Sequence, residues 1–127
     1  MKALVVDDSM VMRKVLIGAL SRLNIGDVDQ AADGVEAVAM ATQNQYNLIL
    51  MDWNMPNKLG IDALKEIRAQ GQTVPVIMVT TEAEKMRVVE ALKAGATNYV
   101  VKPFEPKVIV SKISAALGQT AEEECAV

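Results

Sequence analysis

The sequence contains no histidine and one cysteine. Without histidine, a Ser-His-Asp triad, a histidine-bound zinc ion and a phosphohistidine carrier are all excluded. Cys125 has no second thiol with which to form an intramolecular disulfide, which fits a reducing compartment. We therefore expect a cytoplasmic protein with an inert, exposed thiol, whose chemistry depends on carboxylates, hydroxyls, lysine or a hard metal ion.

Long apolar runs and glycine-rich phosphate loops are also missing. No apolar run approaches the roughly 18 residues of a membrane span, and the N-terminus lacks the pattern of a signal peptide. Neither G-x-x-x-x-G-K-[ST] nor G-x-G-x-x-G occurs, which argues against a bound nucleotide. Thirteen basic and sixteen acidic residues leave a net charge of −3 with no basic run. We therefore expect neither a membrane nor a nucleic acid as a partner.

The length and composition favour one globular domain. The chain has 127 residues, of which 51% are hydrophobic, enough for a single core. Residues 1–118 are predicted to form this domain. Residues 119–127 carry three consecutive glutamates and no periodicity, and we expect them to form a flexible acidic tail. We expect the protein to be a monomer.

Short apolar runs alternate with helical patterns along the chain. Each run precedes a segment with apolar residues at helical spacing, which gives a strand and a helix about five times over. Runs that are continuously apolar indicate strands buried on both faces, and hence a doubly wound α/β fold with a parallel sheet between two helical layers. The predicted strands are residues 3–6, 28–31, 48–51, 76–79 and 99–101.

Polar side chains follow four of the predicted strands directly. Asp7 and Asp8 come after the first strand, Asp52 after the third, Thr80 after the fourth and Lys102 after the fifth. In open parallel sheets, ligands bind outside the carboxyl ends of the strands. We therefore expect these groups to converge on one rim of the sheet.

The residue types on this rim indicate which ligands the site can bind. Carboxylates that lie close together repel one another unless a counterion is present. A hard cation with oxygen ligands, such as Mg²⁺, suits a cluster without histidine. A lysine adds a positive charge for a phosphate, and a threonine adds a hydroxyl donor. The sequence therefore predicts a magnesium-dependent phosphoryl site.

Each of these residues, taken alone, has an ordinary structural explanation. Asp8 or Ser9 can cap the first helix, and Lys102 can be a surface lysine. Tyr99 can be a core tyrosine with a hydrated hydroxyl, and Trp53 is expected to be a partly exposed neighbour of the site. The coincidence of such residues at the ends of four strands favours a shared function.

Four segments resemble the receiver domain of two-component response regulators. They are Val5–Ser9, Met51–Pro56, Met78–Thr80 and Val101–Phe104, and the resemblance extends over residues 2–118. The Asp-Trp-Asn-Met-Pro and Tyr-Val-Val-Lys-Pro-Phe strings are most similar to the single-domain chemotaxis regulators of that family (CheY-like). The resemblance implies a flavodoxin-like sheet with the strand order 2-1-3-4-5.

The resemblance also implies roles at the acidic rim. Asp52 matches the residue that accepts the phosphoryl group as an acyl phosphate. Asp8 matches a direct Mg²⁺ ligand, Asp7 a ligand acting mainly through water, and Asn54 the residue whose backbone carbonyl binds the metal. Asn54 and Glu82 match positions that flank the attacking water and tune the lifetime of the phosphorylated state.

Further roles follow for the ends of the last two strands. Thr80 matches a hydroxyl that bonds a phosphoryl oxygen, and Lys102 a lysine that pairs with the phosphoryl group. Tyr99 matches an aromatic switch residue, which turns as Thr80 moves. The Lys102–Pro103 bond matches one that is usually cis in the family.

The function implied by the resemblance is a phosphorylation-controlled switch. A sensor histidine kinase donates the phosphoryl group, the flagellar motor switch or an equivalent protein is the target, and a phosphatase is a further partner. With no effector domain after the fifth helix, we expect the output to be a protein contact made by the domain itself. The protein is not expected to be an enzyme with a separate substrate. Leu59 departs from the pattern, because many receivers carry an acid at that position.

Three other functions remain to be weighed against the switch. The same fold can serve as a relay or phosphate sink without an output partner. An aspartyl-phosphate hydrolase would need an Asp-x-Asp arrangement after the first strand, but Ser9 stands two residues after Asp7. A flavodoxin-like cofactor carrier is disfavoured because the acidic first turn would repel a flavin phosphate.

Overall fold

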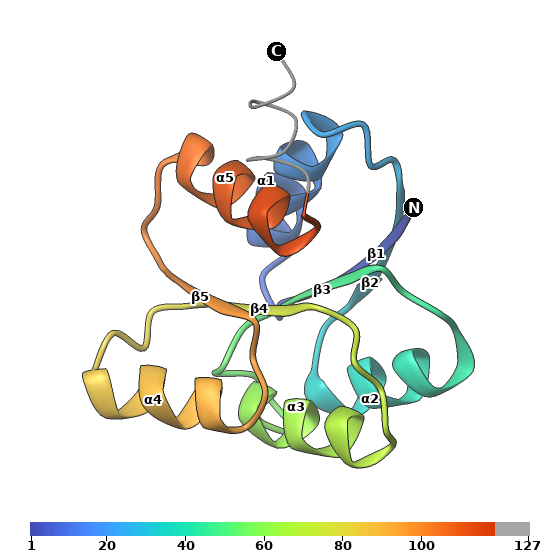
Figure 1. Ribbon diagram of the computed structural model, residues 1–127, viewed down its shortest axis with the longest axis vertical. Helices are drawn as coiled ribbons and strands as arrows, with labels where there is room; N and C mark the ends of the chain where they lie inside the picture. The colour runs from blue at the N-terminus through green and yellow to red at the C-terminus, as the bar shows by residue number, and fades with distance from the viewer. Residues whose placement is uncertain (119–127) are drawn as a thin grey trace.

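The computed structural model describes residues 1–118, so the predicted acidic tail and Cys125 lie outside the described residues. Strands and helices alternate through this part of the chain (Figure 1). The strands are β1 (Lys2–Val6), β2 (Asp27–Ala31), β3 (Leu48–Met51), β4 (Val76–Thr80) and β5 (Asn98–Val101). The helices are α1 (Met10–Ser21), α2 (Gly34–Gln43), α3 (Gly60–Ala69), α4 (Lys85–Lys93) and α5 (Pro106–Ala116).

The five strands form one parallel sheet in the order β2-β1-β3-β4-β5. Helices α1 and α5 cover one face, and α2, α3 and α4 cover the other (Figure 1). This arrangement confirms the predicted doubly wound fold and its strand order. In the part of the chain that the structure describes, no helix is long and apolar enough to cross a bilayer.

The core consists of two apolar layers separated by the sheet. Successive residues of a strand point to opposite faces, so alternate side chains of β1 enter different layers. Leu4 and Val6 pack toward α2, α3 and α4, whereas Ala3 and Val5 pack toward α1 and α5. Strands β3 and β4 are buried throughout and β1 is buried from Ala3 onward, as their continuous apolar runs predict.

Strand β2 differs from the prediction that all strands are apolar and buried on both faces. Its sequence is Asp-Val-Asp-Gln-Ala, and only Ala31 is buried. The strand lies at the edge of the sheet, where one side has no neighbouring strand and polar residues reach solvent. Its position in the sheet is held by pairing with β1.

The helix ends follow local sequence signals. Ser9 and Asp33 cap α1 and α2, since their side chains accept hydrogen bonds from the backbone N–H groups of Met12 and Glu36. Gly95 terminates α4 with a φ of +108°, a conformation that glycine adopts without steric cost. Helix α1 ends at Ser21, slightly before the apolar spacing of its sequence predicts.

Candidate functional site

The strand register places the predicted site residues on one rim. Val6 pairs with Met51, so β1 and β3 end side by side, and Asp7 and Asp52 follow directly. Thr80 is the last residue of β4 and pairs with Val101 of β5, after which Lys102 follows. The convergence predicted from the sequence is therefore confirmed for the residues at the ends of these four strands.

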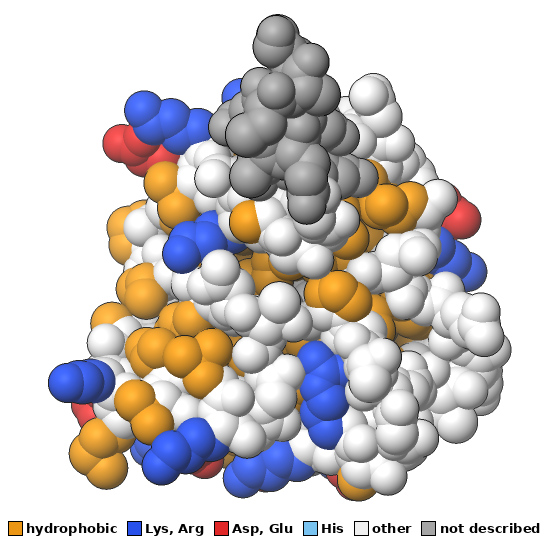
Figure 2. Space-filling model, viewed as in Figure 1, with side chains coloured by type: hydrophobic (Ala, Val, Ile, Leu, Met, Phe, Trp, Pro, Cys, Tyr) orange, Lys and Arg blue, Asp and Glu red, His pale blue; other side chains and the backbone are white. Residues whose placement is uncertain are grey.

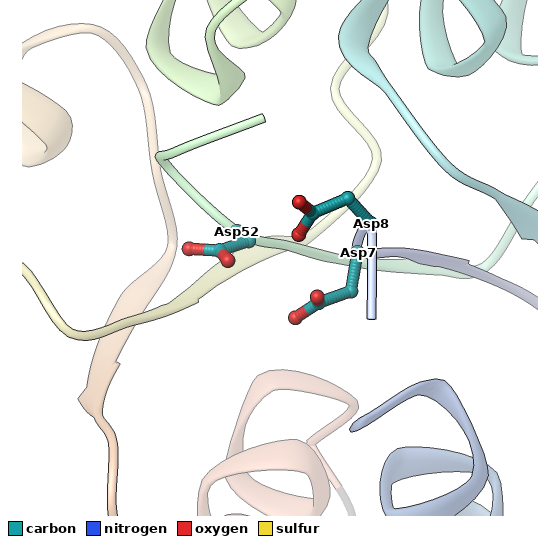
Figure 3. Close-up of side chains that lie close together, drawn as sticks. All are labelled: Asp7, Asp8 and Asp52. Carbon is teal, nitrogen blue, oxygen red and sulfur yellow. The ribbon is translucent and has the colours of Figure 1, made fainter. Parts of the chain in front are cut away.

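Asp7, Asp8 and Asp52 form an acidic cluster. Their carboxylates each offer an oxygen atom, and these atoms lie within 4.8 Å of one another. The Asp8 side chain points toward the α2 and α3 layer and the Asp7 side chain toward the α1 and α5 layer (Figure 3). Asp7 is 1% exposed and Asp52 is 7% exposed, whereas Asp8 is open to solvent. The cluster thus combines two buried carboxylates with one accessible carboxylate.

Lys102 bridges the two buried carboxylates. Its Nζ donates to Asp7 Oδ2 at 2.7 Å and to Asp52 Oδ2 at 3.1 Å. Burial by itself lowers the pKa of the Lys102 ammonium, but the hydrogen bond to Asp7 and the charge of Asp52 outweigh it, so the pKa lies above its ordinary value. Lys102 is therefore a positively charged component of the site, and the interpretation as a plain surface lysine is wrong.

Arg13 holds the backbone of the acidic turn and was not identified from the sequence. Its Nη1 donates to the carbonyl oxygen of Asp7 at 2.6 Å, and its Nε donates to Gln30 Oε1 at 2.9 Å. The Asp7 carboxylate also accepts from the N–H of Ser9 at 2.9 Å. Arg13 lies one turn after the helix cap, and helical side chains lean toward the N-terminus. A basic residue one turn beyond an acidic pair is the signal that could have revealed it.

Gly60 allows α3 to begin directly against the Asp52 backbone. Its N–H donates to the Trp53 carbonyl at 2.8 Å. A Cβ atom at Gly60 would overlap the carbonyl oxygen of Asp52. This close approach requires glycine and fixes the peptide that carries Asp52.

Asn54 and Glu82 meet beside Asp52. The Asn54 Nδ2 donates to Glu82 Oε1 at 3.1 Å, and both side chains are accessible to solvent. The Asn54 N–H also lies 3.4 Å from Asp52 Oδ1. The structure thus joins these two residues by a hydrogen bond, and one of them, Asn54, also approaches Asp52 through its backbone.

The backbone of Glu82 connects Thr80 to Tyr99. Thr80 is fully buried, and its Oγ1 accepts from the Glu82 N–H at 3.3 Å. The Tyr99 hydroxyl donates to the Glu82 carbonyl at 2.6 Å. Tyr99 is 9% exposed, so its hydroxyl is paired with protein rather than mainly hydrated. A movement at Thr80 can therefore reach Tyr99 through one residue.

Trp53 is buried, which corrects the expectation of a partly exposed side chain. It is 3% exposed and belongs to the apolar layer beneath α2, α3 and α4. The chain turns inward after β3, so the residue next to Asp52 enters the core. The Arg87 guanidinium of α4 lies 5.5 Å from the centroid of the Trp53 ring. This contact places α4 next to the residue that follows Asp52.

The pH dependence of stability is expected to report the environment of Tyr99. Burial, followed by the charges of Glu82 and Asp52, raises the pKa of Tyr99 from 10.0 to about 12. The phenol therefore stays protonated in the folded state at pH values where the unfolded chain ionises. This contribution to stability is complete below pH 10 and is lost as the pH rises to about 12.

The expected result is a steeper loss of stability for the wild type than for Tyr99→Phe in alkali. The difference is up to about 1.4 kcal/mol per pH unit. Urea unfolding at a series of pH values from about 9 to 12 measures it. The phenol of Tyr46, whose pKa is also raised, is present in both proteins and cancels. Parallel curves for the two proteins would contradict the assignment.

The acidic cluster fits a hard divalent cation. Its donors are carboxylate oxygens, and the backbone carbonyl of Asn54 lies two residues beyond Asp52. Mg²⁺ is bound in proteins by one or two carboxylates together with water and phosphate, which suits a cluster that is buried on one side and open at Asp8. The residues present can therefore hold such an ion.

The fold and this acidic rim define a receiver domain. A family described as the response regulator receiver domain matches residues 3–114. The chain belongs to this family. The Lys102–Pro103 peptide bond is cis, as the resemblance implies.

Individual relatives extend the match over nearly the whole chain. The chain is 45% identical over 129 residues to a chemotaxis protein CheY homolog of Campylobacter jejuni, covering 99% of both chains. It is 47% identical over 121 residues to the chemotaxis protein CheY1 of Helicobacter pylori, covering 93% of this chain and 98% of that protein. The solved structure of Vibrio cholerae chemotaxis protein CheY4 matches with a TM-score of 0.83 and 36% identity, covering 91% of this chain and 98% of the other.

Proposed function

We propose that the chain is a chemotaxis-type response regulator that accepts a phosphoryl group on Asp52 and thereby changes a protein-binding face. The observation that carries this proposal is the arrangement of Lys102 across Asp7 and Asp52, with Asp8 beside them. Phosphoryl transfer depends mainly on positioning and charge stabilisation, which a lysine and a set of metal-binding oxygens supply.

The transfer step uses a phosphohistidine of a sensor kinase as donor. A carboxylate oxygen of Asp52 attacks phosphorus, and the bond between phosphorus and the imidazole nitrogen breaks. The nitrogen leaves with the electron pair, and a proton carried by the other ring nitrogen of the donor makes the product a neutral histidine. Lys102, already within 3.1 Å of Asp52, lies where its charge can offset that of the phosphoryl oxygens.

Asp7, Asp8, Asp52 and the backbone carbonyl of Asn54 would hold Mg²⁺ in this mechanism. When bound, the ion offsets the negative charge shared by the carboxylates and the phosphoryl oxygens. Arg13 and Ser9 keep the Asp7 backbone and carboxylate in place through their hydrogen bonds.

Hydrolysis returns the protein to its starting state. Water attacks phosphorus, the bond between phosphorus and the Asp52 oxygen breaks, and inorganic phosphate leaves as the carboxylate reforms. We propose that Asn54 and Glu82 set the rate at which water enters, and the hydrogen bond that joins them supports a shared role. A phosphatase would act at the same two residues.

The output step is proposed to run from Thr80 to Tyr99. When the Thr80 hydroxyl turns to a phosphoryl oxygen, the hydrogen bond from the Glu82 N–H is disturbed. The Glu82 carbonyl is the acceptor for Tyr99, so the tyrosine is released to turn inward. This changes the face formed by α4, β5 and α5. A partner that prefers one state of the face shifts the equilibrium by its difference in affinity.

The relatives named for chemotaxis support the cellular role. We infer a cytoplasmic switch that receives its phosphoryl group from a chemotaxis-type histidine kinase and binds a flagellar motor switch protein or an equivalent target. The chain does not act as an enzyme on a separate substrate in this proposal.

Trp53 fluorescence tests the receiver chemistry directly. It is the single tryptophan of the chain, it is buried, and it follows Asp52 in the sequence. We expect Mg²⁺ to change its emission, and acetyl phosphate or phosphoramidate to cause a second change that depends on Mg²⁺. An increase in mass equal to one phosphoryl group should accompany the second change.

Two outcomes would contradict the proposal at different points. A protein that binds Mg²⁺ but gains no phosphoryl mass has the metal site without the transfer to Asp52. A protein unaffected by both additions does not hold the metal at Asp8 and Asp52. Binding of a candidate target before and after phosphorylation then separates a switch from a relay or phosphate sink, because a relay gains no affinity.

A further inference from the structure

A groove lies between α3 and α4, on the face of the sheet opposite α1 and α5. Its volume is about 660 Å³. Lys85, Met86, Val89 and Lys93 line it from α4, and Lys65 lies across from them on α3. Met86, Val89 and Lys93 are spaced three or four apart and share one side of the helix. Among residues 1–118, none from β5 or α5 lines the groove, so it shares only α4 with the proposed output face.

The floor of the groove is apolar and accessible. Met86 is 80% exposed and Val89 is 38% exposed, and they stand one turn apart on α4. Methionine adapts its shape to a bound surface, and clustered exposed apolar side chains mark interaction sites. Hydrophobic and basic side chains are interleaved over α4 (Figure 2). The pattern is typical of a surface that a partner covers.

The rim of the groove is basic, although the whole chain has a net charge of −3. Lys65, Lys85 and Lys93 surround the apolar floor, and Glu90 is the one acidic lining residue. Glu90 already pairs with Lys65 at 3.8 Å and with Arg87 at 3.4 Å. In the described part of the chain, Lys85 and Lys93 form no salt bridge. Their charges are free to attract an acidic partner.

We propose that this groove is a docking site for an amphipathic helix of a partner protein that carries acidic residues beside its apolar stripe. A helix fits because the groove runs between two helices, and a third helix can pack its ridge of side chains there. Its apolar residues contact Met86 and Val89, and its carboxylates face Lys65, Lys85 and Lys93. The partner contacts α3 and α4 but neither β5 nor α5, so it meets the proposed output face only at α4.

A synthetic peptide tests this proposal without a known partner. The probe is a fluorescein-labelled helical peptide with leucines at positions i, i+3 and i+7 and glutamates at the flanking positions. The comparison peptide has lysine in place of each glutamate. Fluorescence anisotropy should show saturable binding of the acidic peptide and at least about tenfold weaker binding of the basic one.

A matched pair of substitutions locates the binding site. Val89→Glu lies in the groove, whereas Val108→Glu lies on α5, and the two valines are 38% and 39% exposed. We expect Val89→Glu to weaken binding of the acidic peptide at least about tenfold. Val108→Glu should leave the affinity for this peptide within about twofold of the wild-type value. Met86→Glu is a second groove variant that tolerates the charge, because that side chain is 80% exposed.

Several results would overturn the proposal. The acidic peptide could fail to bind, or the two peptides could bind equally. Loss of binding in Val108→Glu alone would place the peptide on the output face. A concentration-dependent dimer that Val89→Glu abolishes would identify a second copy of the chain as the occupant. These measurements need neither Mg²⁺ nor a phosphoryl donor, so their failure is distinct from failure of the proposed phosphorylation.

Discussion

Asp52→Asn is expected to abolish phosphoryl transfer from phosphoramidate or acetyl phosphate. An amide has no anionic oxygen with which to attack phosphorus, and loss of a nucleophile typically slows catalysis by about 10³-fold or more. The neighbouring Asp7 carboxylate does not substitute for it, because it is 1% exposed and held by Lys102 and Ser9. Intact-mass analysis of the protein after incubation with Mg²⁺ and the donor measures the result.

Asp62→Asn provides the matched control. Asp62 is an exposed acid in the first turn of α3 and is not part of the acidic cluster, so its substitution should leave the phosphorylated fraction unchanged. Asp8→Asn forms a third comparison, because it removes a proposed metal ligand and keeps the nucleophile. Its phosphorylation should be recovered at raised Mg²⁺ concentration, whereas that of Asp52→Asn should not. A phosphorylated Asp52→Asn protein would show that another residue accepts the group.

Gly60→Ala is expected to destabilise the fold by about 4 kcal/mol, which is at the severe end for single substitutions. The added methyl group would overlap the Asp52 carbonyl oxygen, which is backbone and cannot rotate away. Domains of this size have a free energy of unfolding of about 5–15 kcal/mol, so a large part of the stability would be lost. Urea unfolding monitored by circular dichroism measures the change.

Gly18→Ala makes the same chemical change where space is available. Gly18 lies inside α1, and apart from its chain neighbours and the adjacent backbone of the same helix, no atom lies within 4 Å of the position that its Cβ would take. Alanine is a better helix former than glycine, so this variant should be more stable than the wild type by about 0.5–1 kcal/mol. A similar, small effect for both variants would show that α3 can move away from Asp52 at little cost.

Most of the fold was predictable because its apolar pattern is strong. The continuous runs of β1, β3 and β4 are buried, and the polar residues that follow them reach one rim because parallel strands end together. Strand β2 was the weakest prediction, since an edge strand is held by its neighbour rather than by its own apolar content. The strand order was predicted from the family resemblance, because periodicity alone does not specify the order of strands in a sheet.

Other features could not be predicted because they depend on tertiary contacts. The burial of Trp53 depends on the direction in which the chain turns after β3, which composition does not encode. The contact between Arg13 and the Asp7 carbonyl joins a side chain to a backbone atom, so a basic residue one turn beyond the acidic pair suggests the contact without specifying it. The need for glycine at position 60 appears only when α3 is seen against Asp52.

The bridge from Lys102 to Asp7 also links the chemistry to the completion of folding. Its two residues are 95 positions apart, and they follow the inner strand β1 and the edge strand β5. Such a contact forms late in folding, because closing a long loop costs conformational entropy before the contact provides any stabilisation. In a chain in which β5 has not yet joined the sheet, Lys102 does not contact the carboxylates of Asp7 and Asp52. If Lys102 acts in phosphoryl transfer as proposed, only a chain in which β5 has joined the sheet is expected to accept the phosphoryl group.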